Sequence, residues 1–198
     1  MHSPAISPRT PASIPDSLVI RPVGDGDGPA LARLVAACFA EHEGCLYEAS
    51  EFPELVAPAR HCAAKGADFH VMVAGSALVG SIAITTVPRQ SACEITKFYL
   101  AAAHRGSGAA QTLMQQAARS AMRMGHADLV LWTDTRFARA HRFYEKLGFV
   151  RLPVIRRLAD VSLSWEYRYE RRSAALDPRG AALDPRGAAL DPRGAALP

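Results

Sequence analysis

A short glycine-containing segment at residues 104–110 is the feature that most constrains the fold of this chain. It reads His-Arg-Gly-Ser-Gly-Ala-Ala and lies between Glu94–Leu100, which is typical of a β-strand, and Gly108–Met124, which is typical of an α-helix. Glycines let the main chain approach a ligand closely, and the first N–H groups of a helix lack intrahelical partners. Such a turn favours anions. The segment is therefore expected to bind a phosphate or pyrophosphate group.

Two rows of apolar residues at four-residue spacing run along the predicted helix 108–124. The rows consist of Ala109, Leu113, Ala117 and Ala121, and of Ala110, Met114, Ala118 and Met122. This spacing predicts one apolar stripe behind the glycine turn, packed against the rest of the protein.

Two common kinds of phosphate site fit the sequence poorly. The chain has no Gly-x-x-x-x-Gly-Lys-Ser/Thr run, which argues against nucleoside triphosphate hydrolysis. Gly-x-Gly does follow a predicted strand, and Asp128 lies about where a ribose-binding acid of a dinucleotide fold is expected. However, the third glycine position holds Gln111, and Glu94 and Lys97 interrupt a strand that should be almost wholly apolar. A dinucleotide-binding fold is therefore disfavoured.

The third kind of site binds coenzyme A, and two sequence blocks support it. Residues 105–110 match the Gln/Arg-x-x-Gly-x-Gly/Ala signature, and Ala140–Phe149 ends in Tyr-Glu-Lys-x-Gly-Phe. In both blocks, and in the order of predicted elements from Leu18 to Arg171, the chain resembles the GNAT superfamily of N-acetyltransferases. Phe137 stands where that superfamily often carries Asn, so the resemblance does not extend to an Asn contact with pantetheine.

The resemblance implies an α/β fold of the α+β type. Its centre is a mixed, mostly antiparallel sheet of about six or seven strands flanked by about four helices, with a splayed strand pair at the acetyl-CoA site. The residue pattern predicts strands at 18–22, 69–73, 78–86, 94–100, 129–132 and 163–169, and helices at 29–40, 53–65, 108–124 and 138–147. Asp27 is a candidate cap for the first helix.

The 198 residues, of which 49% are hydrophobic and 21% charged, predict one globular domain at 18–172. A proline-rich segment at 1–17 precedes it and is expected to be flexible. Residues 173–198 contain three Ala-Ala-Leu-Asp-Pro-Arg-Gly repeats, whose prolines and glycines prevent a continuous helix. We expect this tail to be disordered.

Composition also limits the partners. A net charge of +4 suits an anionic cosubstrate, and no nucleic-acid recognition motif accompanies the arginine-rich C-terminal region, so a nucleic-acid partner is not expected. The four cysteines lack Cys-x-x-Cys spacing, which disfavours zinc and disulfides. No apolar run reaches membrane-spanning length, so we expect a cytoplasmic protein without a membrane partner. A homodimer is compatible with the resemblance.

The resemblance assigns acetyl-CoA to two adjacent segments. The backbone of Phe98, Tyr99 and Leu100 would bind the pantetheine arm like an added strand, and one of its N–H groups would polarise the thioester carbonyl. The pyrophosphate would lie on the turn that follows. The turn residues assigned to it are Arg105, Gly106, Ser107, Gly108, Ala109 and Ala110.

Two residues are candidates for proton transfer. Tyr144 is the expected general acid, because a neutral phenol can protonate a departing thiolate at neutral pH. Glu94 is the expected general base, since it occupies a strand position where some members of the superfamily carry a catalytic glutamate, and burial would raise its pKa. A salt bridge would explain Glu94 as well. The base could also be water or one of three histidines, namely His104, His126 and His141.

The sequence thus predicts an acetyl-CoA-dependent N-acetyltransferase that acts by direct attack of a primary amine, without a metal. Cys93 lacks an ordered histidine partner, so a covalent acyl-enzyme is disfavoured. Acidic residues between 41 and 54 point to a cationic amine as acceptor, although solvated helix faces explain them equally well; they are Glu41, Glu43, Glu48, Glu51 and Glu54. A small-molecule amine is modestly preferred over a protein N-terminus or lysine. The alternative is a non-catalytic acyl-CoA-binding module that acts as a sensor or interaction domain.

Overall fold

A single seven-stranded sheet forms the centre of the protein. The computed structural model describes residues 17–173, so nearly all of the expected flexible N-terminal segment and of the repeat tail lie outside the described residues. The strand order is β1-β2-β3-β4-β5-β7-β6. The strands are β1 (Leu18–Pro22), β2 (Asp68–Ala74), β3 (Ala77–Thr86), β4 (Ala92–Leu100), β5 (Asp128–Asp134), β6 (Val150–Arg157) and β7 (Trp165–Arg171). All neighbours pair antiparallel except β4 and β5, which are parallel.

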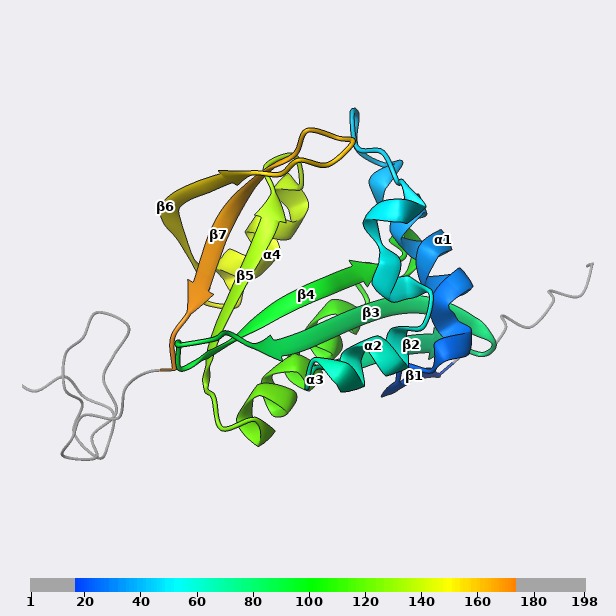
Figure 1. Ribbon diagram of the computed structural model, residues 1–198, viewed down its shortest axis with the longest axis horizontal. Coiled ribbons are helices and arrows are strands. Elements are labelled where there is room, and N and C mark those ends of the chain that lie inside the picture. The colour runs from blue at the N-terminus through cyan, green and yellow to red at the C-terminus, as the bar shows by residue number, and fades with distance from the viewer. Residues whose placement is uncertain (1–16, 174–198) are drawn as a thin grey trace, which may run out of the picture.

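Four α-helices flank the sheet (Figure 1). They are α1 (Gly28–Phe39), α2 (Pro58–Ala64), α3 (Ala109–Arg123) and α4 (Ala138–Lys146). The predicted fold, a mostly antiparallel mixed sheet flanked by four helices, is confirmed. None of these helices is long and apolar enough to cross a membrane, within the described range 17–173.

Strand alternation divides the core between the two faces of the sheet. On one face, Leu31 and Val35 of α1 pack on strand residues that include Ala83. On the other face, Leu113 of α3 packs on Ile82 and on other apolar residues of the central strands. Since successive side chains of a strand point to opposite faces, β3 serves both cores. The helices α1 and α2 therefore cover one side, and α3 and α4 the other.

The predicted helix 53–65 is wrong in extent, because a proline divides it. The chain forms a short 3₁₀ turn at Pro53–Leu55, and α2 begins only at Pro58. Ala57, which precedes the proline, has φ −147° and ψ 72°, outside the helical region. A residue before proline avoids the helical conformation for steric reasons.

Two details of the predicted helices differ in the structure. Met122 of α3 is 64% exposed, whereas Ser120 is fully buried and its hydroxyl accepts a hydrogen bond from Arg123. Asp27 does not cap α1 with its side chain; its carboxylate instead accepts hydrogen bonds from Arg21 and from the Gly24 N–H.

The strand β6 was not predicted from the residue pattern. It is an edge strand that contains Pro153, and most of its side chains are exposed. Proline is tolerated at a sheet edge because no further strand needs its missing N–H group. Because both faces of β6 are largely exposed, its sequence has no regular alternation of apolar and polar residues that would have predicted a strand.

Candidate active site

The strands β4 and β5 form a fork at the centre of the sheet. They pair only from Ala92 to Ile95 of β4, opposite Asp128 to Leu131 of β5. Beyond these residues the two strands diverge (Figure 1). The structure thus contains the splayed pair that was expected. From Thr96 onward, the edge of β4 that faces β5 is not paired with it, and its backbone groups are free to bind a ligand.

A β-bulge shapes β4 where the fork opens. Lys97 and Phe98 together lie opposite Ile82 of β3, between the pairs Ala83–Thr96 and Ser81–Tyr99. Lys97 has φ +50°, which is uncommon for a residue with a side chain. The buried Ser81 hydroxyl donates a hydrogen bond of 2.7 Å to the Lys97 carbonyl, and the Lys97 ammonium pairs with Glu54. Contacts from β3 and from the α1–α2 connection therefore hold the bulge.

The bulge changes which way the following side chains point. Thr96 and Lys97 both line one cavity, although they are consecutive. After them, Phe98 packs on the core beneath α3 and α4, whereas the Tyr99 ring lies 6.1 Å from the ring of Phe39 in α1. One strand thereby contributes side chains to both sides of the fork.

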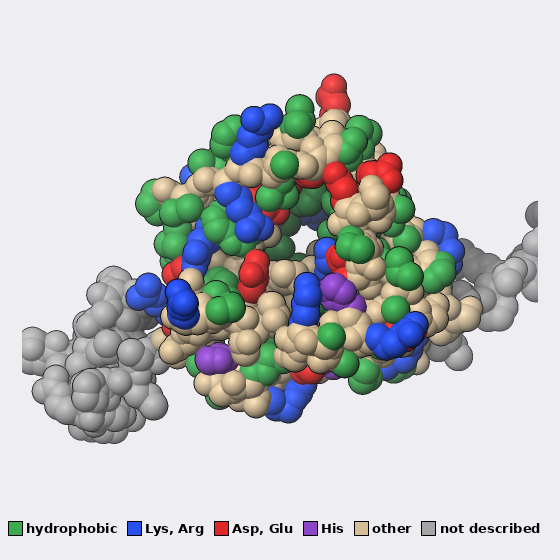
Figure 2. Space-filling view, in the orientation of Figure 1, with side chains coloured by type: hydrophobic (Ala, Val, Ile, Leu, Met, Phe, Trp, Pro, Cys, Tyr) green, Lys and Arg blue, Asp and Glu red, His purple; other side chains and the backbone are tan. Residues whose placement is uncertain are grey.

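The cavity at the fork has a volume of about 340 Å³. Figure 2 shows a hollow near the middle of this face of the molecule. Its walls come from the strands β4 to β7, the ends of α1 and α4, the segment between α1 and α2, and the connections that follow β5 and β6. Aromatic rings form much of the wall, namely Phe39, Phe52, Phe98, Tyr99, Trp132, Phe137 and Tyr144. This size and aromatic lining are typical of small-molecule sites.

Tyr144 lies in the fork, as a general acid should. It comes from α4, lines the cavity and is 5% exposed, and its ring centre is 6.2 Å from that of Phe98. Burial raises the pKa of the phenol, and a contact with Thr133 opposes this only in part. Tyr144 is therefore neutral at physiological pH and can donate a proton.

The predicted pyrophosphate turn connects the end of β4 to α3. Gly106 and Gly108 have φ of +80° and +91°, and a Cβ atom at either position would meet nothing within 4 Å. The first hydrogen bond of α3 from this turn runs from the Thr112 N–H to the Gly108 carbonyl. The backbone N–H groups of residues 109–111 precede it, at the positive end of the helix. The open space above the glycines fits an anion there.

Arg105 is engaged by other parts of the protein rather than directed freely into the turn. Its guanidinium makes a two-pronged ion pair with Glu41, just after α1, and its Nε donates a 3.1 Å hydrogen bond to the Leu100 carbonyl. Burial opposes but does not cancel the effect of Glu41, which raises the pKa of Arg105. Arg105 thus joins α1, the end of β4 and the turn.

Glu94 lies on β4 near the base of the fork but not in the cavity wall. Its side chain is half-buried, and burial raises its pKa. Arg156 and Arg168 partly offset this effect, while Glu166 adds to it. Glu94 and Thr96 point to the same side of the strand, so the carboxylate lies beyond Thr96 as seen from the cavity.

The three candidate histidines are absent from the cavity wall. His141 stacks on Tyr169, with ring centres 5.8 Å apart, and its Nε2 lies 2.9 Å from the Asp134 carbonyl oxygen. Burial lowers the pKa of His141. This environment fits a packed, neutral imidazole.

Asp134, at the end of β5, organises the rim of the cavity. Its carboxylate accepts two hydrogen bonds from the Arg136 guanidinium, at 2.6 and 2.9 Å. Arg136 also donates to the Gly44 carbonyl and the Ser164 hydroxyl, at 2.7 and 2.8 Å. The end of β5 is thereby tied to both connections that border the cavity. No local sequence signal links partners so far apart in the chain.

The structure also shows the state of the cysteines and of potential metal ligands. All four cysteines are free thiols, and Cys45 alone lines the cavity. Within residues 17–173, no three or more His, Cys, Asp or Glu side chains are grouped so as to hold a metal ion.

Residues 30–149, more than half of the chain, match the family model of the acetyltransferase (GNAT) family. The chain therefore belongs to the GNAT acetyltransferase family. No curated protein sequence matches it significantly.

Solved acetyltransferase structures share the fold. A GNAT-family acetyltransferase from Staphylococcus aureus Mu50 is 16% identical, with a TM-score of 0.67 over 78% of this chain and 98% of its own. The PaiA N-acetyltransferase of Thermoplasma acidophilum, in complex with coenzyme A, is 17% identical, with a TM-score of 0.62 over 79% and 99%. YncA of Salmonella typhimurium, with its cofactor acetyl-CoA, is 16% identical, with a TM-score of 0.62 over 81% and 98%.

Proposed function

We propose that this protein is an N-acetyltransferase that moves the acetyl group of acetyl-CoA to a primary amine, with a small-molecule amine as acceptor. The observation that carries the proposal is the β4–β5 fork, which has Tyr144 within it and the glycine turn at its end. Family membership supports the acyl donor, since two structural relatives contain coenzyme A or acetyl-CoA.

Backbone groups do most of the donor binding. The N–H groups at the start of α3 would hold the pyrophosphate in the space above Gly106 and Gly108. The unpaired edge of β4 from Phe98 to Leu100 would pair with the amide groups of pantetheine, as one strand pairs with another. An N–H group of this edge would polarise the thioester carbonyl.

The reaction then needs one base and one acid. The amine nitrogen attacks the carbonyl carbon, the carbon–sulfur bond breaks, and Tyr144 gives its proton to the departing thiolate. Glu94 accepts one proton of the acceptor ammonium before the attack, and the second proton that the nitrogen loses on forming the amide passes to solvent. Because Glu94 lies outside the cavity wall, this transfer runs through a water molecule beside Thr96. Release of the products and exchange with solvent restore both groups.

Calorimetric titration with acetyl-CoA tests the donor site. Wild-type protein should bind acetyl-CoA, and Gly108→Trp should lose binding, because the indole would occupy the space above the turn. Gly125→Trp is the matched control, since Gly125 has a similar φ of +82° and open surroundings at the other end of α3. Equal loss in both variants would indicate backbone strain instead, and a wild-type protein that ignores acetyl-CoA would refute the donor assignment.

Amine-dependent release of coenzyme A tests catalysis in the same preparation. Tyr144→Phe should lower kcat by roughly a hundredfold while leaving the Kd for acetyl-CoA unchanged, since the phenol hydroxyl acts only in the reaction. Full activity in this variant would remove Tyr144 from the mechanism. Binding of acetyl-CoA without transfer to any amine would favour the non-catalytic acyl-CoA-binding module.

A further inference from the structure

Two chain segments meet at the rim of the cavity and close one side of it. The connection between β6 and β7 reaches the segment between α1 and α2, at the top of Figure 1. The Ser162 hydroxyl accepts a hydrogen bond from the Leu46 N–H at 2.8 Å and donates one to the Leu46 carbonyl at 3.2 Å. The Val161 N–H donates to the Glu51 carboxylate at 2.6 Å. This bridge closes one side of the cavity and would obstruct an extended polypeptide that lay across the fork there.

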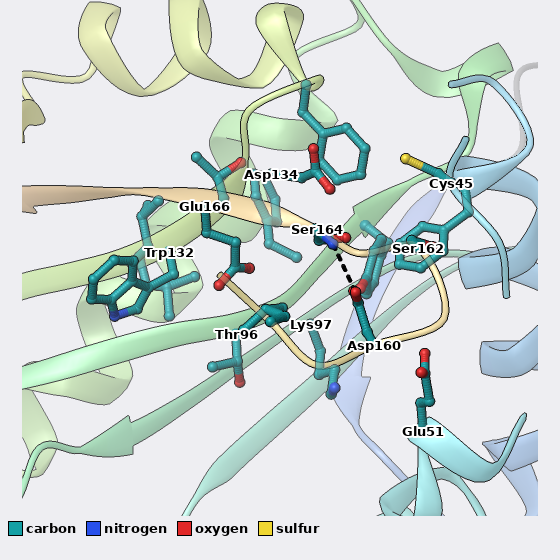
Figure 3. A pocket seen from close by; sticks show the side chains of 18 of the residues that line it. Cys45, Glu51, Thr96, Lys97, Trp132, Asp134, Asp160, Ser162, Ser164 and Glu166 are labelled. Atoms are coloured by element: carbon teal, nitrogen blue, oxygen red, sulfur yellow. Dashed lines mark hydrogen bonds between the residues drawn. The ribbon is translucent and has the colours of Figure 1, made fainter. Parts of the chain in front are cut away.

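Some charged side chains in the cavity wall have a partner of opposite charge, and others do not (Figure 3). Lys97 pairs with Glu54, and Arg156 pairs with Glu166 at 2.7 Å. Asp134 is paired with Arg136, which lies behind it. Each cation at the cavity therefore already has a carboxylate partner.

Two carboxylates of the wall have no such partner. Glu51 and Asp160 line the cavity, and neither forms an ion pair with any residue in the described range 17–173. Each accepts a backbone hydrogen bond: Glu51 from Val161, and Asp160 from Ser164 at 2.7 Å (Figure 3). The cavity thus has an excess of two negative charges, both on the side formed by the bridge.

We infer that the acceptor is a small aliphatic amine that carries a second positive charge, which Glu51 and Asp160 bind while the first amine reacts at the fork. The inference rests on the proposed acetyltransferase function and specifies its acceptor. A dication neutralises both carboxylates when the bound ligand displaces water from the cavity. Asp160 is half-buried and Glu51 is exposed, so a neutral acceptor would partly desolvate Asp160 and leave both carboxylates without a counter-ion, which is unfavourable. An acceptor with a carboxylate would meet no free cation and would be repelled.

Acceptors that differ only in the group at the far end of the chain test the charge requirement. Diaminobutane, aminobutanol and aminobutanoate place an ammonium, a hydroxyl and a carboxylate at that end, and longer and shorter homologues of each cover the length of the cavity. The expected order of kcat/KM is diamine, amino alcohol, amino acid, with at least about fivefold between neighbours at low salt. Equal kcat/KM values, a preference for the amino acid, or no transfer to any of these amines would overturn the inference.

Charge-neutral substitutions show which residues cause the preference for a second positive charge. Glu51→Gln and Asp160→Asn keep an oxygen that can accept the backbone hydrogen bond, so the bridge should remain closed. Each should raise KM for the diamine by about fivefold and leave KM for the amino alcohol unchanged. Glu48→Gln is the control, because Glu48 is a neighbouring acid outside the cavity wall. An equal loss with all three variants, or a loss with both classes of acceptor, would contradict the assignment.

A peptide with one lysine tests whether the bridge excludes polypeptides. It should be a far poorer acceptor than the diamine, and a peptide with the higher kcat/KM would refute the small-molecule assignment.

Binding of acetyl-CoA, measured separately by calorimetry, distinguishes failure of the acceptor inference from failure of the proposed function. If acetyl-CoA binds and a monoamine is acetylated as fast as the diamine, the function stands and the acceptor inference fails. If acetyl-CoA does not bind, the proposed function itself fails.

Discussion

Burial acts differently on the two proposed proton-transfer residues. It raises the pKa of Tyr144, which keeps the phenol neutral but makes it a weaker acid than an exposed tyrosine. It also raises the pKa of Glu94, which makes the carboxylate a stronger base than an exposed glutamate. Desolvation therefore favours the proposed base, whereas proton donation by Tyr144 depends on the basicity of the departing thiolate.

The pH dependence of kcat/KM should report on Glu94. The carboxylate acts only when it is deprotonated, so activity should fall as the pH drops through its pKa, which burial places above the usual glutamate range. Glu94→Gln should lower the maximal kcat/KM by roughly tenfold to a hundredfold, and the decrease of kcat/KM toward acidic pH, the acidic limb, should disappear. The exposed Glu43→Gln is the control. An acidic limb that persists in Glu94→Gln would assign the titration to another group.

Single residues of the site differ in how far the sequence could reveal them. Tyr144 and the glycines of the turn lie within short sequence motifs, so the local amino-acid sequence was enough to propose them. Glu41 lies 64 residues from its partner Arg105, and no local pattern joins them. Lys97 was visible only as a charge that interrupts a strand; the bulge that it occupies depends on how β4 pairs with β3.

At the scale of elements, the ion pair between Arg105 and Glu41 ties the end of α1 to the turn before α3. The guanidinium also holds the Leu100 carbonyl at the end of β4. From these contacts we propose that Arg105 positions the turn, in place of the direct pyrophosphate contact expected from the sequence.

A double-mutant cycle on this pair separates the two roles. Glu41→Gln should weaken acetyl-CoA binding by about threefold or more, Arg105→Gln should weaken it similarly, and the double variant should be little worse than either single variant. Isothermal calorimetry at constant ionic strength measures the Kd of acetyl-CoA for wild type, both single variants and the double variant. Glu43→Gln is the control, because it removes the charge of a nearby acid outside the pair. Tighter binding in Glu41→Gln would show instead that a released Arg105 binds phosphate.

The elements themselves were mostly predictable, and the exceptions have physical causes. Strong periodicity identified α3 and the central strands to within a few residues of their ends. The helix expected at 53–65 failed at Pro58, where the steric restriction on Ala57 outweighs the local apolar pattern. The strand β6 was missed because an exposed edge strand needs no buried face.

At the scale of the whole molecule, Asp134 and Arg136 join three segments that the sequence keeps far apart. Burial would raise the pKa of Asp134, but the hydrogen bonds and charge of Arg136 outweigh it, so the pKa is lowered. The stabilisation from this pair is therefore complete above the unfolded-state pKa of about 3.9 and is lost as the pH falls through the lower folded-state pKa.

Urea unfolding of Asp134→Asn measures this contribution. The free energy of unfolding should fall by about 1–3 kcal/mol at neutral pH, because the half-buried guanidinium of Arg136 loses its buried counter-ion. The difference from wild type should shrink below about pH 4, where protonation of Asp134 has the same effect. Asp128→Asn, at the opposite end of β5, is the control. A difference that does not change with pH would mean that the charge of Asp134 contributes nothing.

The bulge at Lys97 has a consequence for the length of β4. If this one residue were missing, Ile95, Phe98 and Leu100 would still face α3, and Glu94, Thr96 and Tyr99 would still face the other side, because the remaining residues would alternate regularly. Lys97 is therefore an inserted amino acid that bends the strand without rearranging either core. An insertion of one amino acid into a strand can thus be accepted without any change in the sequence of either core.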